Sequence, residues 1–476
     1  MELNKLEKLD ECLWQIQRRG GMRVPAIIYA SSDLIAGMDN KVYEQITNVA
    51  CLPGIVRAAI AMPDAHWGYG FPIGGVAAFD PDEGGIISVG GVGYDISCGV
   101  RTMLTGFTRD EIGQKLPMLA DRLFETIPSG VGSEGSMRLS PSELDDMLLH
   151  GAKWAVKSGY GTDEDLKYIE EHGVLEGADP SCVSDIAKRR QHRQIGTLGS
   201  GNHYLEIQYV EKIFDQQDAD ALCLKEDDII ISIHCGSRAL GHQIGTDYIQ
   251  ILGQASKKYN IPIKERELVC APIRSPEGEQ YYKAMACGVN CALANRQVIG
   301  HMVREVFADI FPQAKIKLLY DVSHNTCKIE EHDVDGAMKR LYVHRKGATR
   351  AFGPGRKELP AQFTNTGQPV FIGGTMGTHS YILVGKKSGE ALAWGSACHG
   401  AGRAISRNAA LKRWRGRDVI ANLARKDIFI RTGSLRGAAE EAPDAYKDVS
   451  KVVDAMHTAG LAKKVARVKP LACIKG

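Results

Sequence analysis

Three strand-like runs in this chain each carry a histidine at one end. They are His203 before Tyr204–Val210, His234 at the close of 228–234, and His324 after Ile316–Val322 and one serine. Alternating or β-branched runs of this length predict strands, and the run before His234 predicts a buried one. A single histidine in such a position is usually a core residue. Three in the same setting indicate a place where loops meet the core and ligating side chains gather.

A glycine-rich stretch from Gly90 to Gly99 places Asp95 and Cys98 three residues apart, behind the apolar run 86–89. Glycine lets the backbone turn sharply and approach a ligand closely. A carboxylate and a thiolate leaving such a turn could reach one metal ion or bridge two. The alternative is a tight turn with an inert cysteine, because free cysteine is among the most buried residue types. Together with the three histidines, the pair predicts a metal site, for which ligand softness alone favours zinc.

His399 directly precedes a glycine turn, 400–402, and a helix that we expect over Ala404–Ala424. The free N–H groups at a helix N-terminus form an anion site, and Arg403 and Arg407 stand one turn apart beside it. The pattern favours His399 as a nucleophile or acid that faces a bound phosphate. A capping turn with an incidental histidine is the alternative.

Two further segments are candidates for supporting roles. The Gly/Pro/aromatic loop after Met62 contains Asp64 and His66, which could contact metal ligands from outside or simply cap a turn. The basic run Lys188–Arg193 precedes the glycine-rich stretch before His203. This position favours phosphate binding over an ordinary solvated face.

The length and composition indicate one large mixed domain. The 476 residues contain no linker, repeat or low-complexity tract, and 44% are hydrophobic and 24% charged. We therefore expect a single α+β domain over 1–476, in which 107–185 form a peripheral helical insertion. At the N-terminus we expect an amphipathic helix through Leu3, Leu6, Leu9 and Leu13, followed by a strand over Val24–Tyr29.

Other features of the composition exclude classes of protein. No apolar run approaches the ~18 residues of a membrane span, and the charged N-terminus is unlike a signal peptide. We therefore expect a cytoplasmic protein without a membrane partner. The twelve cysteines include no Cys-x-x-Cys pair, which predicts mostly reduced packing residues. The net charge of +2 means that any nucleic-acid surface must be local.

Six long motifs follow one another along the chain. They are Pro63-Asp-x-His-x-Gly-Tyr-Gly-Phe-Pro-Ile-Gly-Gly75, Gly-Tyr-Asp95-Ile-Ser-Cys98-Gly, Gly-Asn202-His203-Tyr-Leu-Glu206, His234-Cys-Gly-Ser-Arg238, Asp-Val-Ser-His324-Asn325 and His399-Gly-Ala-Gly-Arg403. With them the chain resembles the RtcB family of tRNA-splicing RNA ligases from about Val24 to its C-terminus. The resemblance implies central β-sheets surrounded by helices, with a dinuclear metal site at strand ends.

The resemblance also implies a set of site residues. Two Mn²⁺ ions are expected, one held by Cys98, His203 and His234 and the other by Asp95, Cys98 and His324, so that Cys98 bridges them. The expected GTP-binding residues are Asn202, Glu206, Asn325, Thr375, Ser380, His399, Gly400, Ala401, Gly402, Tyr446 and Lys475. Lys475 is expected to contact the guanine from a docked C-terminal tail, and Arg238 and Arg403 are expected to contact RNA phosphates.

The implied reaction is GTP-dependent ligation of RNA. His399 takes the guanylyl group from GTP and passes it to an RNA 3′-phosphate, and a 5′-hydroxyl end then displaces GMP. Ends that carry a 2′,3′-cyclic phosphate are hydrolysed first. Expected partners are tRNA exon halves or cleaved RNA, with archease as a candidate activator.

Three alternatives remain open from the sequence. A dinuclear metallophosphoesterase would use the same Asp/Cys/His set without GTP, but it leaves His399 and Lys475 without a task. A non-catalytic RNA-binding protein would not need the intact metal-ligating residues and the intact His399 of this chain. A relative specialised for RNA repair or 3′-end capping would keep every residue named above.

Overall fold

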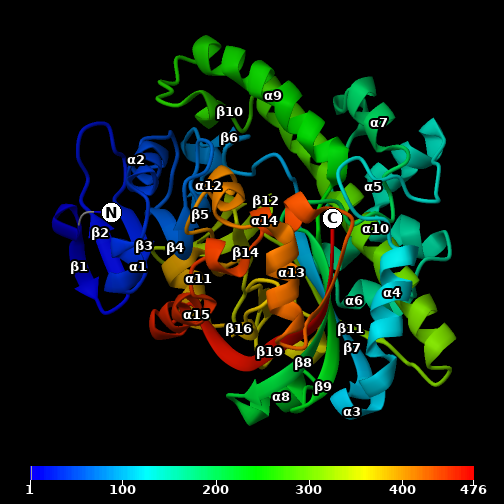
Figure 1. Cartoon of the computed structure of the whole chain (residues 1–476). Helices are drawn as coiled ribbons and strands as arrows, with labels where there is room; N and C mark the ends of the chain where they lie inside the picture. The colour runs from blue at the N-terminus through cyan, green and yellow to red at the C-terminus, as the bar shows by residue number, and fades with distance from the viewer. Residues whose placement is uncertain (2) are drawn as a thin grey trace.

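The structure of the protein is a computed structural model that describes residue 1 and residues 3–476, with residue 3 described by its backbone alone. Two large, mostly antiparallel sheets form the centre, and helices surround them (Figure 1). This architecture confirms the predicted mixed α+β class. None of the described helices combines the length and apolar composition needed to cross a bilayer.

The larger sheet brings the three histidine-bearing strands together. Its strand order is β11-β7-β9-β8-β19-β16-β15, with β18 also paired to β19. The bounds are β7 Gly99–Thr108, β8 Tyr204–Ile213, β9 Asp228–Cys235, β11 Lys317–Ser323, β15 Pro369–Ile372, β16 Ser380–Gly385, β18 Phe429–Thr432 and β19 Ala462–Lys475. The predicted strands are therefore confirmed as β8, β9 and β11. In the register, Gly99 pairs with both Ser323 and Cys235, and Tyr204 pairs with His234, so the candidate ligands emerge at one place on the sheet.

The second sheet corrects one expectation for the N-terminus. Its strands, in spatial order, are β1 Glu7–Asp10, β2 Leu13–Ile16, β3 Ala26–Tyr29, β4 Ala59–His66, β5 Ile73–Phe79, β13 Ala337–Lys346 and β12 Asn325–Val334. We expected a helix through Leu3, Leu6, Leu9 and Leu13, and this expectation is wrong for the described residues of the segment. A hairpin of β1 and β2 lies there instead. Pairing of β2 with β3 buries Trp14 and Ile16, which outweighs the helical spacing of the leucines. The predicted strand near Tyr29 is confirmed as β3.

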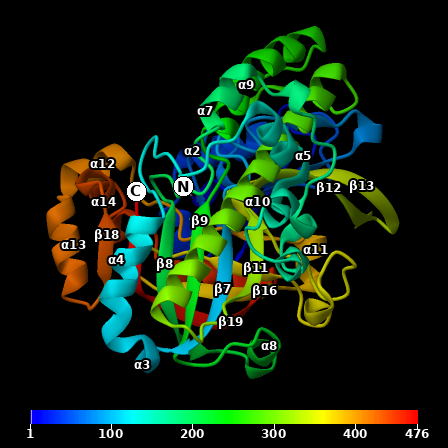
Figure 2. The same ribbon diagram turned by 90° about the vertical axis from the view of Figure 1, so that its right-hand side faces the viewer.

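Long helices cover the larger sheet. Helix α10 (Pro276–Ile310, 35 residues) crosses it and packs against α9 (Arg238–Lys258) and α5 (Pro141–Lys157), as Figure 2 shows. The segment 107–185 is largely helical, as expected, with α3 Arg109–Ile112, α4 Leu116–Thr126, α5 and α6 Asp163–Lys167. The remaining helices are α1 Ser32–Ala36, α2 Asn40–Val49, α7 Asp185–Gln191, α8 Gln216–Ala221, α11 Lys387–Ala393, α12 Arg407–Arg413, α13 Gly416–Ala424, α14 Leu435–Glu440 and α15 Val449–Thr458. Two short strand pairs, β6 Ile86–Ser88 with β10 Cys270–Pro272 and β14 Ala348–Arg350 with β17 Ser396–Cys398, complete the fold.

The expected helix over Ala404–Ala424 is wrong in two respects. It begins only at Arg407, where the Ser406 side chain caps α12, so a loop and not a helix N-terminus follows His399. It is also broken at Trp414, whose extended backbone ends α12 before α13 begins. The break lets Gly416 approach the Leu435 carbonyl so closely that a Cβ at this position would lie 1.9 Å from it.

Candidate active site

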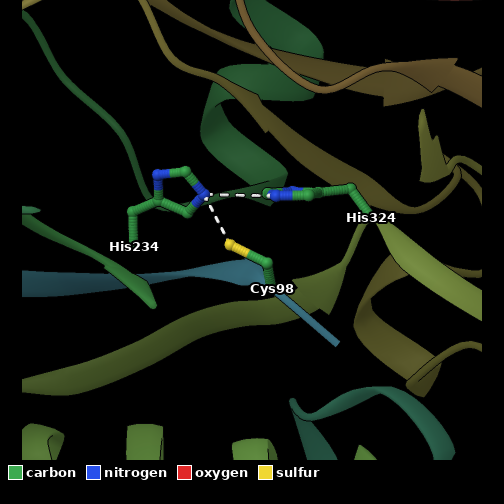
Figure 3. A group of neighbouring side chains, drawn as sticks. All are labelled: Cys98, His234 and His324. Carbon is green, nitrogen blue, oxygen red and sulfur yellow. Dashed lines mark hydrogen bonds between the residues drawn. The ribbon is translucent and has the colours of Figure 1, made fainter. Parts of the chain in front are cut away.

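Five candidate ligands converge where strands of the larger sheet end. Cys98 directly precedes β7, His203 precedes β8, His234 is the penultimate residue of β9, and His324 lies between β11 and β12. The Sγ of Cys98 lies 3.1 Å from the Nε2 of His234 and 3.4 Å from that of His203. The Nε2 atoms of His234 and His324 are 3.1 Å apart, and Figure 3 shows these two rings facing each other above the thiol. Asp95 completes the group through a carboxylate oxygen 2.8 Å from the Nε2 of His203.

The donor atoms form two triads that share Cys98. One contains Cys98, His234 and His324 and the other Asp95, Cys98 and His203, with all atoms of a triad within 4.8 Å of one another. The five residues and the shared thiol are those that the resemblance implied. The triads group donor atoms by distance alone, so the division of His203 and His324 between the two expected ions stays a prediction. Within the cluster, the His203 ring lies beside the Asp95 carboxylate and the His324 ring lies beside His234.

The protonation chemistry of this group fits divalent cations. The Nδ1 atoms of His203 and His234 each lie 3.1 Å from a backbone carbonyl, that of Leu198 and that of Asn202 respectively. Protons on those nitrogens leave Nε2 of each ring as a ligand atom, the usual arrangement for metal-binding histidines. Burial, with charged neighbours, lowers the pKa values of His234 and His324 well below their usual range, so both rings are neutral.

The two remaining donors differ in how they become anionic. Burial alone would raise the pKa of Asp95, but the neighbouring His203 holds that pKa at about 2. Burial and the adjacent Asp95 carboxylate raise the pKa of the Cys98 thiol well above its usual value. A bound cation is what would ionise such a thiol, since metal coordination deprotonates cysteine.

A buried arginine on α10 braces the loops that carry these ligands. The guanidinium of Arg296 donates to the carbonyl oxygens of Ser97 and Cys235 at 2.7 and 3.0 Å, and to the hydroxyl of Ser323 at 3.1 Å. These three residues directly adjoin Cys98, His234 and His324 in the chain. Asp321 neutralises the guanidinium at 2.8 Å, and Arg296 is fully buried. One side chain therefore fixes the relative positions of three ligand-bearing segments.

His399 lies beside the metal donors and is oriented by Asp64. It follows β17, and its Nδ1 donates to a carboxylate oxygen of Asp64 at 2.6 Å, while its backbone N–H donates to the same oxygen at 3.1 Å. This contact leaves Nε2 as the ring nitrogen with a free lone pair. The ring centre is 5.0 Å from that of His324. Burial disfavours the Asp64 carboxylate, yet the adjacent His399, with its hydrogen bonds to that carboxylate, lowers the pKa of Asp64 below its usual value.

Asp64 contacts His399, and His66 contacts the backbone of Asp64. The carboxylate of Asp64 orients His399 and is not hydrogen-bonded to a candidate metal ligand in the described structure. His66 lies 3.1 Å from the carbonyl of Asp64 through its Nδ1, and burial lowers its pKa to about 3.

A cavity of about 590 Å³ opens beside His399 and His234. Its lining includes ten of the residues expected to bind GTP, namely Asn202, Glu206, Thr375, Ser380, His399, Gly400, Ala401, Gly402, Tyr446 and Lys475. Asn325 lies elsewhere. Its side chain donates to the carbonyl of Asp95 at 3.0 Å and accepts from the N–H of Gly347 at 2.7 Å, which places it among the metal donors.

Comparison with known proteins identifies the family of the chain. The family model described as tRNA-splicing ligase RtcB matches residues 45–476. The chain belongs to the RtcB family. A protein of Thermococcus kodakarensis named tRNA-splicing ligase RtcB is 49% identical over the whole of both chains, and one of Archaeoglobus fulgidus with the same name is 50% identical over 99% of each. The RNA-splicing ligase RtcB of Mycobacterium tuberculosis is 50% identical over 91% of this chain and all of its own.

The C-terminal tail of this RtcB family member forms one wall of the cavity. Strand β19 pairs with β8 up to Lys475, so the tail is docked, and a Cβ on Gly476 would clash with the carbonyl of Gly199. The Nζ of Lys475 lies 3.9 Å from a carboxylate oxygen of Glu441, and both side chains are buried. Burial raises the pKa of the nearby Glu206 to about 7, although the charge of Lys475 opposes the rise.

The two arginines expected to contact RNA have protein partners in this structure. Arg403 lines the cavity, and its guanidinium donates to Glu441, to the Tyr446 hydroxyl and to the Glu440 carbonyl. Arg238 is half-buried behind the loop before His203, and its Nε donates to Thr197 at 3.0 Å. Arg407 is the more accessible cation at the cavity, with a side chain that is 54% exposed.

Several site residues were missed by the sequence reasoning. Glu441 and Lys447 line the cavity, and Lys447 donates to the carbonyl of Ala65 at 2.6 Å. Neither stands in a motif with a recognisable spacing, so the sequence carried no signal for them. Arg296 was detectable, because it stands in a polar interruption, 295–297, of the mostly apolar stretch 284–300.

Proposed function

We propose that this protein is a GTP-dependent RNA ligase that joins 3′-phosphate or 2′,3′-cyclic phosphate ends to 5′-hydroxyl ends. Membership of the RtcB family and full-length similarity to proteins named tRNA-splicing ligase support the ligase activity. The observation that carries the GTP-dependent mechanism is the hydrogen bond from His399 to the buried Asp64 carboxylate at 2.6 Å. It prepares one nitrogen of a histidine in the cavity to act as a nucleophile.

In the first step, the lone pair on Nε2 of His399 attacks the α-phosphorus of GTP. A P–N bond forms, the bond from the α-phosphorus to the bridging oxygen breaks, and pyrophosphate leaves with the electron pair. The ring becomes positively charged, and Asp64 stabilises that charge through Nδ1. The guanylyl group then moves to an RNA 3′-phosphate oxygen, which regenerates His399. Finally, a 5′-hydroxyl attacks that phosphate, GMP leaves and the hydroxyl proton is released.

Asp95, Cys98, His203, His234 and His324 would hold two divalent ions next to this histidine. On the family resemblance we propose manganese, although ligand softness alone favours zinc. Bound there, such ions would neutralise negative charge on the phosphates during transfer. The protein's own contribution is to orient His399 through Asp64 and to keep the donors in place through Arg296.

The part of the cavity lined by Glu206 and Lys475 suits a guanine base. As a carboxylate, Glu206 accepts N–H donors of the kind that a guanine edge presents, and Lys475 offers a donor beside it. We propose that Tyr446 and Ser380 line this nucleotide site with Asn202 and Thr375, while residues 400–402 lie against the phosphates. Arg407 would contact phosphates, and Arg403 would do so after its protein partners rearrange. Arg238 would support the RNA from behind the loop that precedes His203. We also propose that residues 1–476 form a single domain and that a partner such as archease activates the enzyme.

A ligation assay tests this function. Purified protein, Mn²⁺ and two RNA oligonucleotides, one ending in a 3′-phosphate and one beginning with a 5′-hydroxyl, should give a joined product only when GTP is added. The phosphoesterase alternative predicts release of inorganic phosphate without GTP and no joined product. Adding archease distinguishes an inactive ligase from a phosphoesterase, because only the ligase would respond.

A further inference from the structure

Two large aromatic side chains are exposed at the cavity. Trp67 and Tyr69, in the loop between β4 and β5, are 58% and 62% exposed, and both line the cavity that contains His399. Among the described residues, the other exposed large aromatic side chain is Phe214, which is only 38% exposed. Trp67 stands three residues beyond Asp64, so it extends from the segment that orients His399.

The loop that carries these rings is held firmly on its inner side. Gln45 of α2 donates to the carbonyl of Gly68 at 2.8 Å and accepts from its N–H at 3.1 Å. The buried ammonium of Lys346 donates to the carbonyl oxygens of Tyr69 and, at 3.2 Å, Phe71. The rings are therefore exposed on a fixed backbone, which is the arrangement that lowers the entropic cost of binding.

From Tyr69 the rings continue through the half-buried Tyr94 and the exposed His242 towards one exposed cation, Arg190. Tyr69 meets Tyr94 edge to face at a centroid distance of 6.4 Å, and Tyr94 stacks on the exposed His242 of α9 at 5.6 Å. The residue after His242 is Gln243, which accepts a hydrogen bond from the exposed Arg190 of α7 at 2.8 Å. Aromatic faces on which bases stack, together with cationic side chains, are how proteins bind single-stranded nucleic acid without reading its sequence.

We propose that Trp67 and Tyr69 form a stacking shelf for unpaired bases at the RNA end that reacts beside His399. The inference rests on the proposed ligase function and specifies how its RNA substrate is held. Stacking suits an enzyme that joins ends of different sequence, because every base presents a flat π-face. A protein partner would instead need a larger apolar patch, whereas the exposed residues here are two rings on one loop.

The test combines substitutions in the protein with abasic changes in the RNA, made singly and together. Fluorescence anisotropy measures the Kd of short single-stranded oligonucleotides in the presence of Mn²⁺ and the absence of GTP. One series ends in a 3′-phosphate and another begins with a 5′-hydroxyl, and an abasic nucleotide is placed at each position in turn near the end. The proteins are wild type, Trp67→Ala, Trp67→Phe and, as control, Met338→Ala, which truncates an exposed side chain on β13.

If the shelf exists, one abasic position weakens wild-type binding by about fivefold or more, the range for one stacked base. Trp67→Ala weakens binding to the intact oligonucleotide by a similar factor, and the abasic change then has no further effect. Trp67→Phe retains most of the affinity, and Met338→Ala binds like wild type. The series that shows this coupling identifies the RNA end that occupies the shelf.

The proposal would be overturned if, in both series, the abasic change and Trp67→Ala raised the Kd by independent factors. It would also be overturned if neither change affected the Kd. Loss of binding in Trp67→Ala that is the same for every abasic position would also overturn it, because the ring would then not be stacking on a base. Transfer of label from GTP to wild-type protein is followed separately. If the wild-type protein takes up no label but the effects of Trp67→Ala and of one abasic position are still coupled, the ligase mechanism is contradicted and the shelf is not.

Discussion

His399 and Asp64 lie 335 residues apart in the chain, yet the imidazole Nδ1 and the carboxylate are joined by a 2.6 Å hydrogen bond. The Asp64 carboxylate is fully buried, and it also accepts the backbone N–H of His399 at 3.1 Å. A buried carboxylate against one nitrogen fixes the tautomer and leaves the other nitrogen nucleophilic. The chemistry proposed for His399 therefore depends on Asp64.

Replacing that carboxylate tests the dependence. Asp64→Asn keeps the size of the side chain but removes the charge that stabilises a cationic ring. We expect guanylyl transfer from GTP to the protein to slow by about 100-fold or more, as for loss of a group that supports acid–base chemistry. Metal content, measured by mass spectrometry of the acid-digested protein, should not change. An unchanged transfer rate would show that Asp64 does not orient the nucleophile.

Arg296 should control metal affinity without touching a metal. Arg296→Met removes the hydrogen bonds to Ser97, Cys235 and Ser323, so the ligand-bearing loops lose their common brace. We expect the Kd for Co²⁺, followed through its thiolate absorption band, to rise by about 10- to 100-fold, the range for loss of residues that orient ligands.

Arg304→Met is the matched control for that experiment. Arg304 lies on the same helix and forms a largely buried ion pair with Asp165 at 2.6 Å, so its loss should lower stability without loosening the ligands. Equal changes in Co²⁺ affinity for Arg296→Met and Arg304→Met would indicate general destabilisation and would contradict the brace.

The binding of GTP should depend on pH through Glu206. Burial raises the pKa of this side chain to about 7, so the carboxylate that accepts guanine N–H groups is only partly formed at neutral pH. We expect the KM for GTP to fall as the pH rises through 7. Glu206→Gln should raise the KM and remove this part of the pH profile. A profile that is the same in both proteins would show that Glu206 does not titrate in the nucleotide site.

The same shift predicts a change in stability. Because the folded-state pKa of Glu206 lies above the usual value of 4.5, the folded protein binds more protons than the unfolded chain between these two pH values. The contribution of Glu206 therefore becomes less favourable as the pH rises from about 4.5 to about 7. Denaturant unfolding of Glu206→Gln should show a smaller loss over that range than wild type.

Lys475 should contribute to nucleotide binding and not to general stability. We expect Lys475→Met to raise the KM for GTP by about tenfold, since a hydrogen bond to a charged group contributes roughly 1.5–3 kcal/mol. Lys469→Met, on the same strand but outside the cavity lining, is the control. A similar KM for both variants would contradict a role for the docked tail in holding GTP.

Much of the site was predictable because its residues stand at strand ends. Alternating or β-branched runs predicted β8, β9 and β11. The histidines beside these runs were therefore expected at the ends of the strands. The division of the histidines between two ions stays a prediction, because the Cys98 thiol lies close to both His203 and His234. The partnership of Asp64 with His399 was also hidden, since it joins β4 to the end of β17 across two different parts of the fold.

Other errors arose where tertiary contacts outweighed local patterns. The leucines near the N-terminus have helical spacing, but pairing with β3 makes that segment a hairpin. A segment with good helical propensity is divided at Trp414 into two helices, and the division allows the close contact of Gly416 with Leu435. No local window contains the partner strand or the neighbouring helix that decides these outcomes.

The most direct test of the account is transfer of label from α-labelled GTP to the protein. Wild-type protein with Mn²⁺, and with archease if needed, should show a labelled band after denaturing electrophoresis. The label should be lost in acid, as expected for a phosphoramidate, and should not form with α-labelled ATP. His399→Ala should retain its metal and show no band. A labelled His399→Ala protein, or an unlabelled wild type that still joins RNA ends, would contradict the proposed mechanism.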